Sequence, residues 1–221
     1  MEKNLTTGNV FKNVVLFSLP YLLSYFLQTL YGMADLFIIG QFEGVASTTA
    51  VSIGSQVMHM LTVMIVGLSM GTTVSVGQAV GAGDRKQAAH NIGNTVILFL
   101  VVSVALTAIL LSLVHPIVVA MSTPTDAVSG TITYLTICFI GIPFITSYNI
   151  ISSIFRGLGD SKSPMVFVAI ACAANIALDV LFMGALKLGP VGAALGTTLS
   201  QALSVAAALR AIIKRKMIPG L

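Results

Sequence analysis

Charge is the property that this sequence has least of. Only 8% of its 221 residues are Asp, Glu, Lys or Arg, whereas 56% are hydrophobic and the mean hydropathy is +0.99. Soluble domains carry about 25% charged residues, so a soluble globule of this composition would lack the polar surface that keeps it dissolved. The composition therefore excludes an ordinary soluble protein and predicts that lipid is the solvent for most of the chain.

Cysteine and clustered basic residues are also scarce. Cys138 and Cys172 both fall inside apolar runs, so we expect small core side chains rather than a disulfide or a metal site. The net charge is +4, but the positive residues form short patches between apolar runs, which argues against nucleic-acid binding. The first apolar run continues past Asp35 without a small-residue cleavage site, which argues against a signal peptide.

In place of charge, the chain has six long apolar runs. Each reaches roughly 20 residues or more, enough to span a hydrocarbon core of about 30 Å at 1.5 Å per residue. Lipid cannot satisfy open backbone groups, which favours helices, and the alternating segments of a membrane barrel are not seen. We predict one all-α domain over residues 1–221, a bundle of six transmembrane helices at about 14–40, 50–78, 91–114, 128–155, 165–187 and 191–213.

The loops between the runs predict the orientation in the membrane. If the N-terminus is cytoplasmic, the outer segments hold only Lys187 among the eleven Lys and Arg residues. This is the bias expected from the positive-inside rule, and it predicts that both termini face the cytoplasm. The ten cytoplasmic residues are Lys3, Lys12, Arg85, Lys86, Arg156, Lys162, Arg210, Lys214, Arg215 and Lys216.

A short motif repeats in two of the predicted cytoplasmic loops. The segments GAGDRK (81–86) and GLGDSK (157–162) both read G-x-G-D-x-K and follow the second and fourth runs. Glycine provides backbone freedom and aspartate accepts hydrogen bonds from the first turn of a helix. We expect two tight turns in which Asp84 and Asp160 cap the next helix.

Proline and glycine punctuate the runs themselves. Pro20 lies inside the first run and Pro143 inside the fourth, and each removes a backbone hydrogen bond and can bend its helix. Bent helices often surround cavities in transporters. The small-residue pairs Gly67/Gly71 and Gly192/Gly196 predict close helix packing.

Two of the seven acids, Asp35 and Asp179, lie within apolar runs. An ionised carboxylate near the bilayer centre costs about 2.5–3.5 kcal/mol on insertion scales, so it needs partners, water or a proton. Counted from the outer ends of their runs, Asp35, Asp179 and Thr197 lie roughly 8–12 Å below the outer membrane surface. The sequence therefore predicts one polar layer in the outer half of the bilayer, but it does not give the lateral distance between the acids.

Polar neighbours share a helix face with each acid. Asn175 and Asp179 are i and i+4, whereas Gln28, Tyr31 and Asp35 are i, i+3 and i+7. We expect both faces to point into the bundle. Such groups suit a cation, either Na⁺ held by oxygen atoms or a proton on a carboxylate, because an apolar environment favours the protonated form.

Two plainer interpretations remain open. The polar residues can be structural contacts between helices. Methionine usually fills space in protein cores, and the ten methionines of this chain can do so. Alternatively, Met33, Met58, Met60 and Met64 can line an adaptable pocket for drugs.

Five stretches carry a more specific signal: LPYLLSYFLQTLYGMADLFIIGQF (19–42), VGQAVGAGDRKQA (76–88), FRGLGDSKSPM (155–165), NIALD (175–179) and GPVGAALGTTLS (189–200). Together they cover nearly the whole chain and resemble the N-terminal half of a multidrug and toxin extrusion (MATE) transporter. The resemblance implies a six-helix lobe in a prokaryotic inner membrane, alternating access to a central cavity, and no enzymatic activity. It also implies export of organic, often cationic compounds in exchange for Na⁺ or H⁺, with no other cofactor.

The resemblance further implies roles for individual residues. The coupling cation would be bound, as Na⁺ or H⁺, by Asp35, Asn175, Asp179 and Thr197. The polar residues of the substrate cavity would be Gln28, Tyr31, Tyr134 and Asn149. Members of the family have about twelve helices, so the expected partners are a C-terminal lobe or a second copy of this chain, the lipid bilayer and small organic cations.

Three other functions fit parts of the pattern. An intramembrane aspartyl protease uses a G-x-G-D motif, but Asp84 and Asp160 lie at helix ends and Lys follows each within two residues. A lipid-linked precursor flippase would display cationic residues for phosphate, and the apolar runs contain acids without a buried Arg or Lys. A purely structural bundle would leave the two membrane acids without a role.

Overall fold

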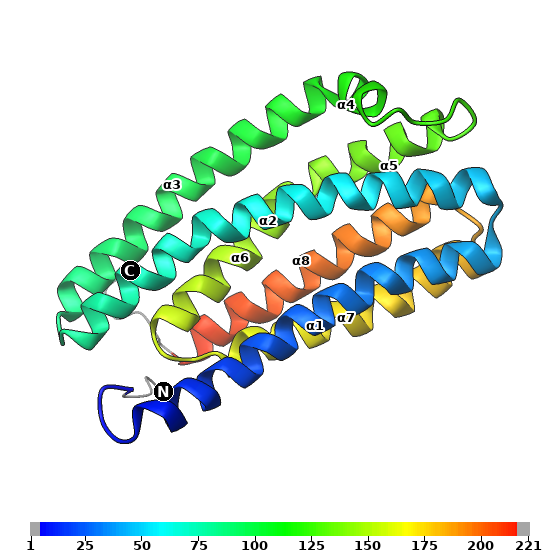
Figure 1. Ribbon diagram of the computed structural model, residues 1–221. Helices are drawn as coiled ribbons and strands as arrows, with labels where there is room; N and C mark the ends of the chain where they lie inside the picture. Colours follow the sequence, from blue (N-terminus) through cyan, green and yellow to red (C-terminus); the bar gives the residue numbers. More distant parts are fainter. Residues whose placement is uncertain (1–4, 216–221) are drawn as a thin grey trace.

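The computed structural model describes residues 5–215, which form a bundle of long helices (Figure 1). Lys3 and Lys216, which the orientation argument uses, lie outside the described residues. The elements are α1 (Val10–Phe42), α2 (Val45–Gly81), α3 (Arg85–Ser112), α4 (Val114–Ala120), α5 (Val128–Ile140), α6 (Ile142–Gly157), α7 (Lys162–Asp179), the π-helical segment η1 (Val180–Ala185) and α8 (Pro190–Arg215).

The six predicted spans are confirmed by helix length and composition. Five helices are long and apolar enough to cross a membrane, with α7 and η1 counted together as Lys162–Ala185. The sixth span is the pair α5 and α6, which meet at an angle of 48°. Most of the helices extend a few residues beyond the apolar runs, and the short helix α4 was not predicted.

Helices that are distant in sequence pack side by side in the bundle. Helix α7 packs against both α1 and α8, while α2 packs against α5 and α6 and is flanked by α3 (Figure 1). The start of α1, the turns at 81–85 and 157–162, and the end of α8 all lie at one end of the bundle, here called the basic end. The bundle therefore has six passes with both described termini on the same side.

The two G-x-G-D turns have the predicted geometry. Gly83 and Gly159 adopt φ values of +75° and +84°, a left-handed conformation that L side chains disfavour. The Asp84 carboxylate accepts a hydrogen bond from the Gln87 backbone N–H at 2.9 Å. The Asp160 carboxylate accepts from the backbone N–H groups of the first residues of α7 at 3.0 Å. Both aspartates therefore cap the helix that follows, as expected.

The predicted proline bends have different outcomes. Pro143 lies in the first turn of α6, directly after the break at Gly141 between α5 and α6. A Cβ atom at Gly141 would lie 2.8 Å from Thr198 Cγ2 of α8, so the backbone at the break packs directly against the Thr198 side chain. Helix α1 instead continues through Pro20 as one element, and the Pro20 carbonyl accepts a hydrogen bond from Ser24 Oγ at 2.9 Å.

The predicted glycine contacts are confirmed for only one of the two pairs. A Cβ at Gly192 would lie 3.0 Å from Phe182 Cβ, and one at Gly196 would contact the Asp179 carboxylate. For Gly67 and Gly71 the prediction is wrong within the described residues, because no atom lies within 4 Å of the added Cβ. That face of α2 is open.

The bundle exposes apolar side chains along its outer helices. Phe26 of α1 and Ile97 of α3 are among many large hydrophobic residues that stay exposed, while Tyr134, Leu135 and Phe139 form the centre of the core. Lipid tails can cover such a surface without cost. Both cysteines are free and buried, as predicted.

Candidate functional site

The two membrane acids meet between α1, α7 and α8. Asp179 is the last residue of α7 and is fully buried, as is Asn175, and Asp35 of α1 is only 2% exposed. The side chain of Asp35 interacts with those of Asp179, Asn175 and Thr197. The structure therefore brings the four predicted residues together, and their depth in the bilayer stays a prediction.

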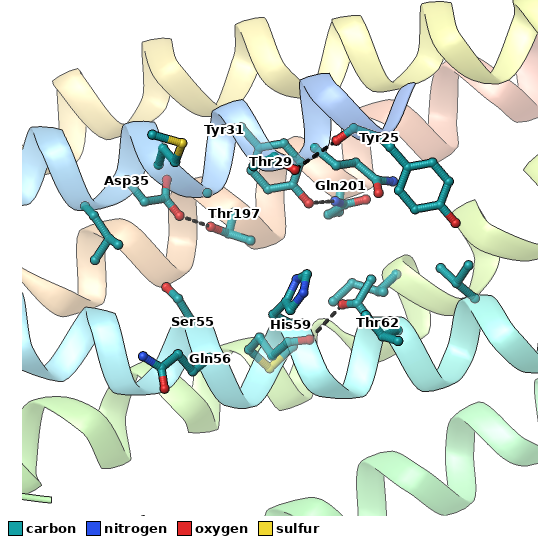
Figure 2. A pocket seen from close by; sticks show the side chains of 18 of the residues that line it. Tyr25, Thr29, Tyr31, Asp35, Ser55, Gln56, His59, Thr62, Thr197 and Gln201 are labelled. Carbon is teal, nitrogen blue, oxygen red and sulfur yellow. Dashed lines mark hydrogen bonds between the residues drawn. The ribbon is translucent and has the colours of Figure 1, made fainter. Parts of the chain in front are cut away.

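Two hydrogen bonds attach α1 to α8 beside the acids. Thr197 Oγ1 donates to Asp35 Oδ2 at 3.1 Å, and Gln201 Nε2 donates to the Tyr31 hydroxyl at 3.0 Å (Figure 2). Thr197 and Gln201 are one helical turn apart on α8, as are Tyr31 and Asp35 on α1. The polar faces of the two helices consequently run in register.

Several polar atoms at this site have no hydrogen-bond partner among the described residues. They are Asp35 Oδ1, both carboxylate oxygens of Asp179, and both polar atoms of the Asn175 side chain. Buried polar atoms without partners are rare in native proteins and call for an explanation. Hard cations are bound by carboxylate, amide and hydroxyl oxygens. A protonated carboxyl can instead donate a hydrogen bond to its neighbour. These oxygen atoms thus fit either Na⁺ or a proton.

The backbone around Asp179 is irregular. Helix α7 changes to the π-helical segment η1 directly after Asp179, and the Leu186 N–H donates to the Leu181 carbonyl at 3.0 Å, five residues back. Short π-helical segments occur frequently at functional sites. Gly196 of α8 faces Asp179, and its missing side chain leaves room for the carboxylate. The Gly192/Gly196 pair was predictable from its spacing, whereas the π-helical segment was not predicted.

A cavity of about 460 Å³ lies next to the acid pair, walled by α1, α2, α5, α6 and α8. Its volume is in the range of small-molecule sites. The predicted residues that line it are Gln28, Tyr31, Asp35, Tyr134, Asn149 and Thr197. Asn175 and Asp179 do not line the cavity, so Asp35 is the acid that belongs to both the cavity and the buried pair.

Much of the cavity wall was not predicted from the sequence. Helix α2 contributes polar residues at helical spacing, a pattern that the second apolar run of the sequence displays. The missed polar residues are Tyr25, Thr29, Ser52, Ser55, Gln56, His59, Thr62, Tyr148 and Gln201. Of the methionines considered, Met33 and Met58 line the cavity, whereas Met60 and Met64 are exposed elsewhere.

The cavity wall contains one acidic side chain and no permanently positive one among the described residues. Asp35 lines it, and the lining contains no Lys or Arg among the described residues. Tyr25, Tyr31, Tyr134 and Tyr148 add four aromatic rings, whose faces attract cations. The wall is therefore chemically suited to an organic cation.

Comparison with known proteins identifies the family. Residues 20–181, most of the chain, match the family described as MatE. The chain belongs to the MatE family. Two similar relatives from Bacillus subtilis are named "Probable multidrug resistance protein YpnP", 36% identical over 97% of this chain, and "Probable multidrug resistance protein YoeA", 30% identical over 87%.

Solved structures of MatE proteins share the fold. A chain described as "Crystal structure of MATE in the bent conformation" superposes with a TM-score of 0.89 and 28% identity, over 96% of this chain and 47% of that chain. The chain also covers 48% of YpnP and 42% of YoeA, so it spans about half the length of the curated relatives it matches. Both relatives are named as probable multidrug resistance proteins, in agreement with the predicted class.

Proposed function

We propose that this chain is one lobe of a cation-coupled antiporter that exports organic cations by alternating access. The observation that carries the proposal is the position of Asp35, which lines the cavity and also contacts the buried Asp179. The Asp35 carboxylate can thereby interact with two cations, the cargo in the cavity and the coupling ion at the buried acid pair.

In the proposed mechanism the two cations compete. Na⁺ would be held by oxygens of Asp35, Asn175, Asp179 and Thr197, whereas a proton would be shared between the two carboxyl groups. Either cation neutralises Asp35 and removes the attraction that holds the cargo. Because Thr197 donates a hydrogen bond to Asp35, a change in the charge of Asp35 also alters how α1 is held to α8 and so biases two arrangements of α1.

The proposal includes a location and a partner. The basic end of the bundle would face the cytoplasm of a prokaryotic cell, with the lobe in the cytoplasmic membrane. The cavity would be completed by a C-terminal lobe or by a second copy of this chain. The names of the relatives, which are multidrug resistance proteins, support drugs or toxins as the cargo.

The alternative of a lipid-linked precursor flippase is less well supported. Its cargo carries phosphate, which proteins bind with Arg and Lys. Within the described residues, the cavity wall has neither.

Binding of the permanently charged dye ethidium tests the proposal. The purified chain in lipid nanodiscs should bind ethidium saturably, and the affinity should fall when NaCl replaces KCl at constant pH or when the pH is lowered. A sodium effect identifies Na⁺ as the coupling ion, and a pH effect that depends on Asp179 identifies H⁺. Asp179→Asn, which preserves side-chain volume, should abolish the Na⁺ effect and the part of the pH effect that arises from the acid pair, because it removes one of the two carboxylates. Ethidium binding itself should persist, because Asp179 does not line the cavity.

The exposed loop residue Asp126 provides the matched control. Asp126→Asn removes one carboxylate outside the cavity and should leave both ethidium binding and its cation response unchanged. The proposal is wrong if Asp179→Asn responds to Na⁺ and pH as the wild type does, or if the wild-type chain does not bind ethidium.

A further inference from the structure

His59 is the titratable group of the cavity that the proposed function leaves unused. It lies on α2, in the wall opposite to the acid pair, and its side chain is exposed to the cavity space. Figure 2 shows the imidazole projecting from α2 toward the row formed by Asp35, Thr197 and Gln201. It therefore faces any cargo that Asp35 attracts.

The charge of the cavity is determined by two side chains. Asp35 carries a negative charge when ionised, and histidine is the residue type whose charge changes between about pH 5 and 8. The other titratable groups that face the cavity are four tyrosines, which are neutral in this range: Tyr25 and Tyr31 of α1, Tyr134 of α5 and Tyr148 of α6. Helix α8 contributes only the neutral side chains of Thr197 and Gln201. With Asp35 ionised, the cavity charge is thus −1 with a neutral imidazole and zero with an imidazolium.

We propose that His59 is a proton-dependent specificity residue, which admits organic cations when it is neutral and expels them when it is protonated. The inference rests on the proposed function and deepens it. Cargo binding exchanges one cation for another: the organic cation enters the cavity, and the imidazolium releases one proton to solvent. The like-charge repulsion is strong because the cavity is walled by apolar helices that screen charge less than water does.

This proton site is physically separate from the acid pair. His59 is on α2, whereas Asp35 and Asp179 are on α1 and α7, and no hydrogen bond links His59 to the acids among the described residues. A proton on His59 therefore acts on the cargo directly, through charge, and not through the hydrogen bonds between α1 and α8. An exporter built this way expels its cargo more completely on the acidic side of the membrane.

The test compares ethidium affinity at about pH 7.5 and pH 5.5 for chains in nanodiscs. Ethidium keeps its charge over this range, so changes in affinity report on the protein. In the wild type the dissociation constant should be larger at pH 5.5 than at pH 7.5. His59→Gln should lower the ratio of the pH 5.5 value to the pH 7.5 value by about tenfold. His59→Lys, which is charged at both pH values, should weaken binding by about tenfold at pH 7.5. Proton release on ethidium binding, measured in weak buffer, should fall in His59→Gln.

The other two histidines of the chain serve as controls. His90 and His115 are exposed on α3 and α4, outside the cavity, and His90→Gln and His115→Gln should behave as wild type. An unchanged affinity ratio together with unchanged proton release in His59→Gln overturns the inference. If Asp179→Asn still loses its cation response, the proposed function survives that result. Failure of the wild-type chain to bind ethidium overturns both.

Discussion

Gly196 leaves the space into which the Asp179 carboxylate fits. The carboxylate approaches the backbone of α8 so closely that even one methyl group at position 196 would collide with it. Asp179 is fully buried and ends α7, so its side chain cannot turn out into solvent. At the scale of residues, the acid pair thus depends on a missing side chain as much as on the acids.

Gly196→Ala should therefore destabilise the protein and disturb the cation response. Overpacking a buried site typically costs about 1–3 kcal/mol, which should appear as a lower thermal midpoint in detergent and as a weakened effect of Na⁺ or pH on ethidium binding. Gly71→Ala is the matched control, because Gly71 is also helical but has no atom within 4 Å of the added Cβ. An unchanged midpoint in Gly196→Ala would contradict the assigned packing.

The fourth span is one element in sequence and two helices in space. Helices α5 and α6 meet at 48° at Gly141, where the backbone approaches Thr198 of α8. Pro143 lies in the first turn of α6, a position where the missing N–H has no helical partner to lose. The close approach of Gly141 to α8 therefore stabilises the bend, and Pro143 only permits it.

Gly141→Ala should accordingly cost more stability than Pro143→Ala. The added methyl group at position 141 would collide with the Thr198 side chain and crowd the Cys138 carbonyl, at a cost of about 1–3 kcal/mol. Loss of Pro143 should change the unfolding free energy by less than about 1 kcal/mol. Gly93→Ala in α3 introduces the same methyl group where no atom lies within 4 Å and controls for helix propensity. Thermal or urea unfolding in detergent measures all three, and an equal or larger cost for Pro143→Ala would refute this explanation.

The molecule as a whole is asymmetric along the bundle axis. The described basic residues gather at the end that holds the two G-x-G-D turns and both described termini, while Lys187 lies at the opposite end. The outer helices expose apolar side chains between these ends. The combination predicts a lobe that crosses the bilayer six times with its basic end in the cytoplasm.

Single cysteines measure this orientation. Lys86→Cys at the basic end and Asp126→Cys at the opposite end place a thiol on exposed positions. The two native cysteines are buried and provide a low background. In right-side-out membrane vesicles, an impermeant maleimide should label Asp126→Cys and leave Lys86→Cys unlabelled until the vesicles are opened. The reverse pattern would show that the orientation is inverted.

Local patterns determined the elements of this protein. Six apolar runs predicted six spans because each run is long enough to cross lipid, and the G-x-G-D turns were predictable because glycine and aspartate act on their immediate neighbours. Counting residues along the apolar runs predicted a similar depth for Asp35, Asp179 and Thr197, whereas the distance of 3.1 Å between Thr197 Oγ1 and Asp35 Oδ2 was known only from the structure. Their role in binding a cation stays a prediction.

Only the tertiary structure decided which faces meet. The sequence treated Gly67/Gly71 and Gly192/Gly196 alike, yet the second pair packs against α7 and η1 while the first faces open space. The tertiary structure also gives the two acids different positions, because Asp35 lines the cavity and Asp179 does not. His59 lies in the cavity wall opposite to them. The physical reason is that periodicity determines the side of a helix on which a residue lies, whereas lateral packing determines what that side contacts.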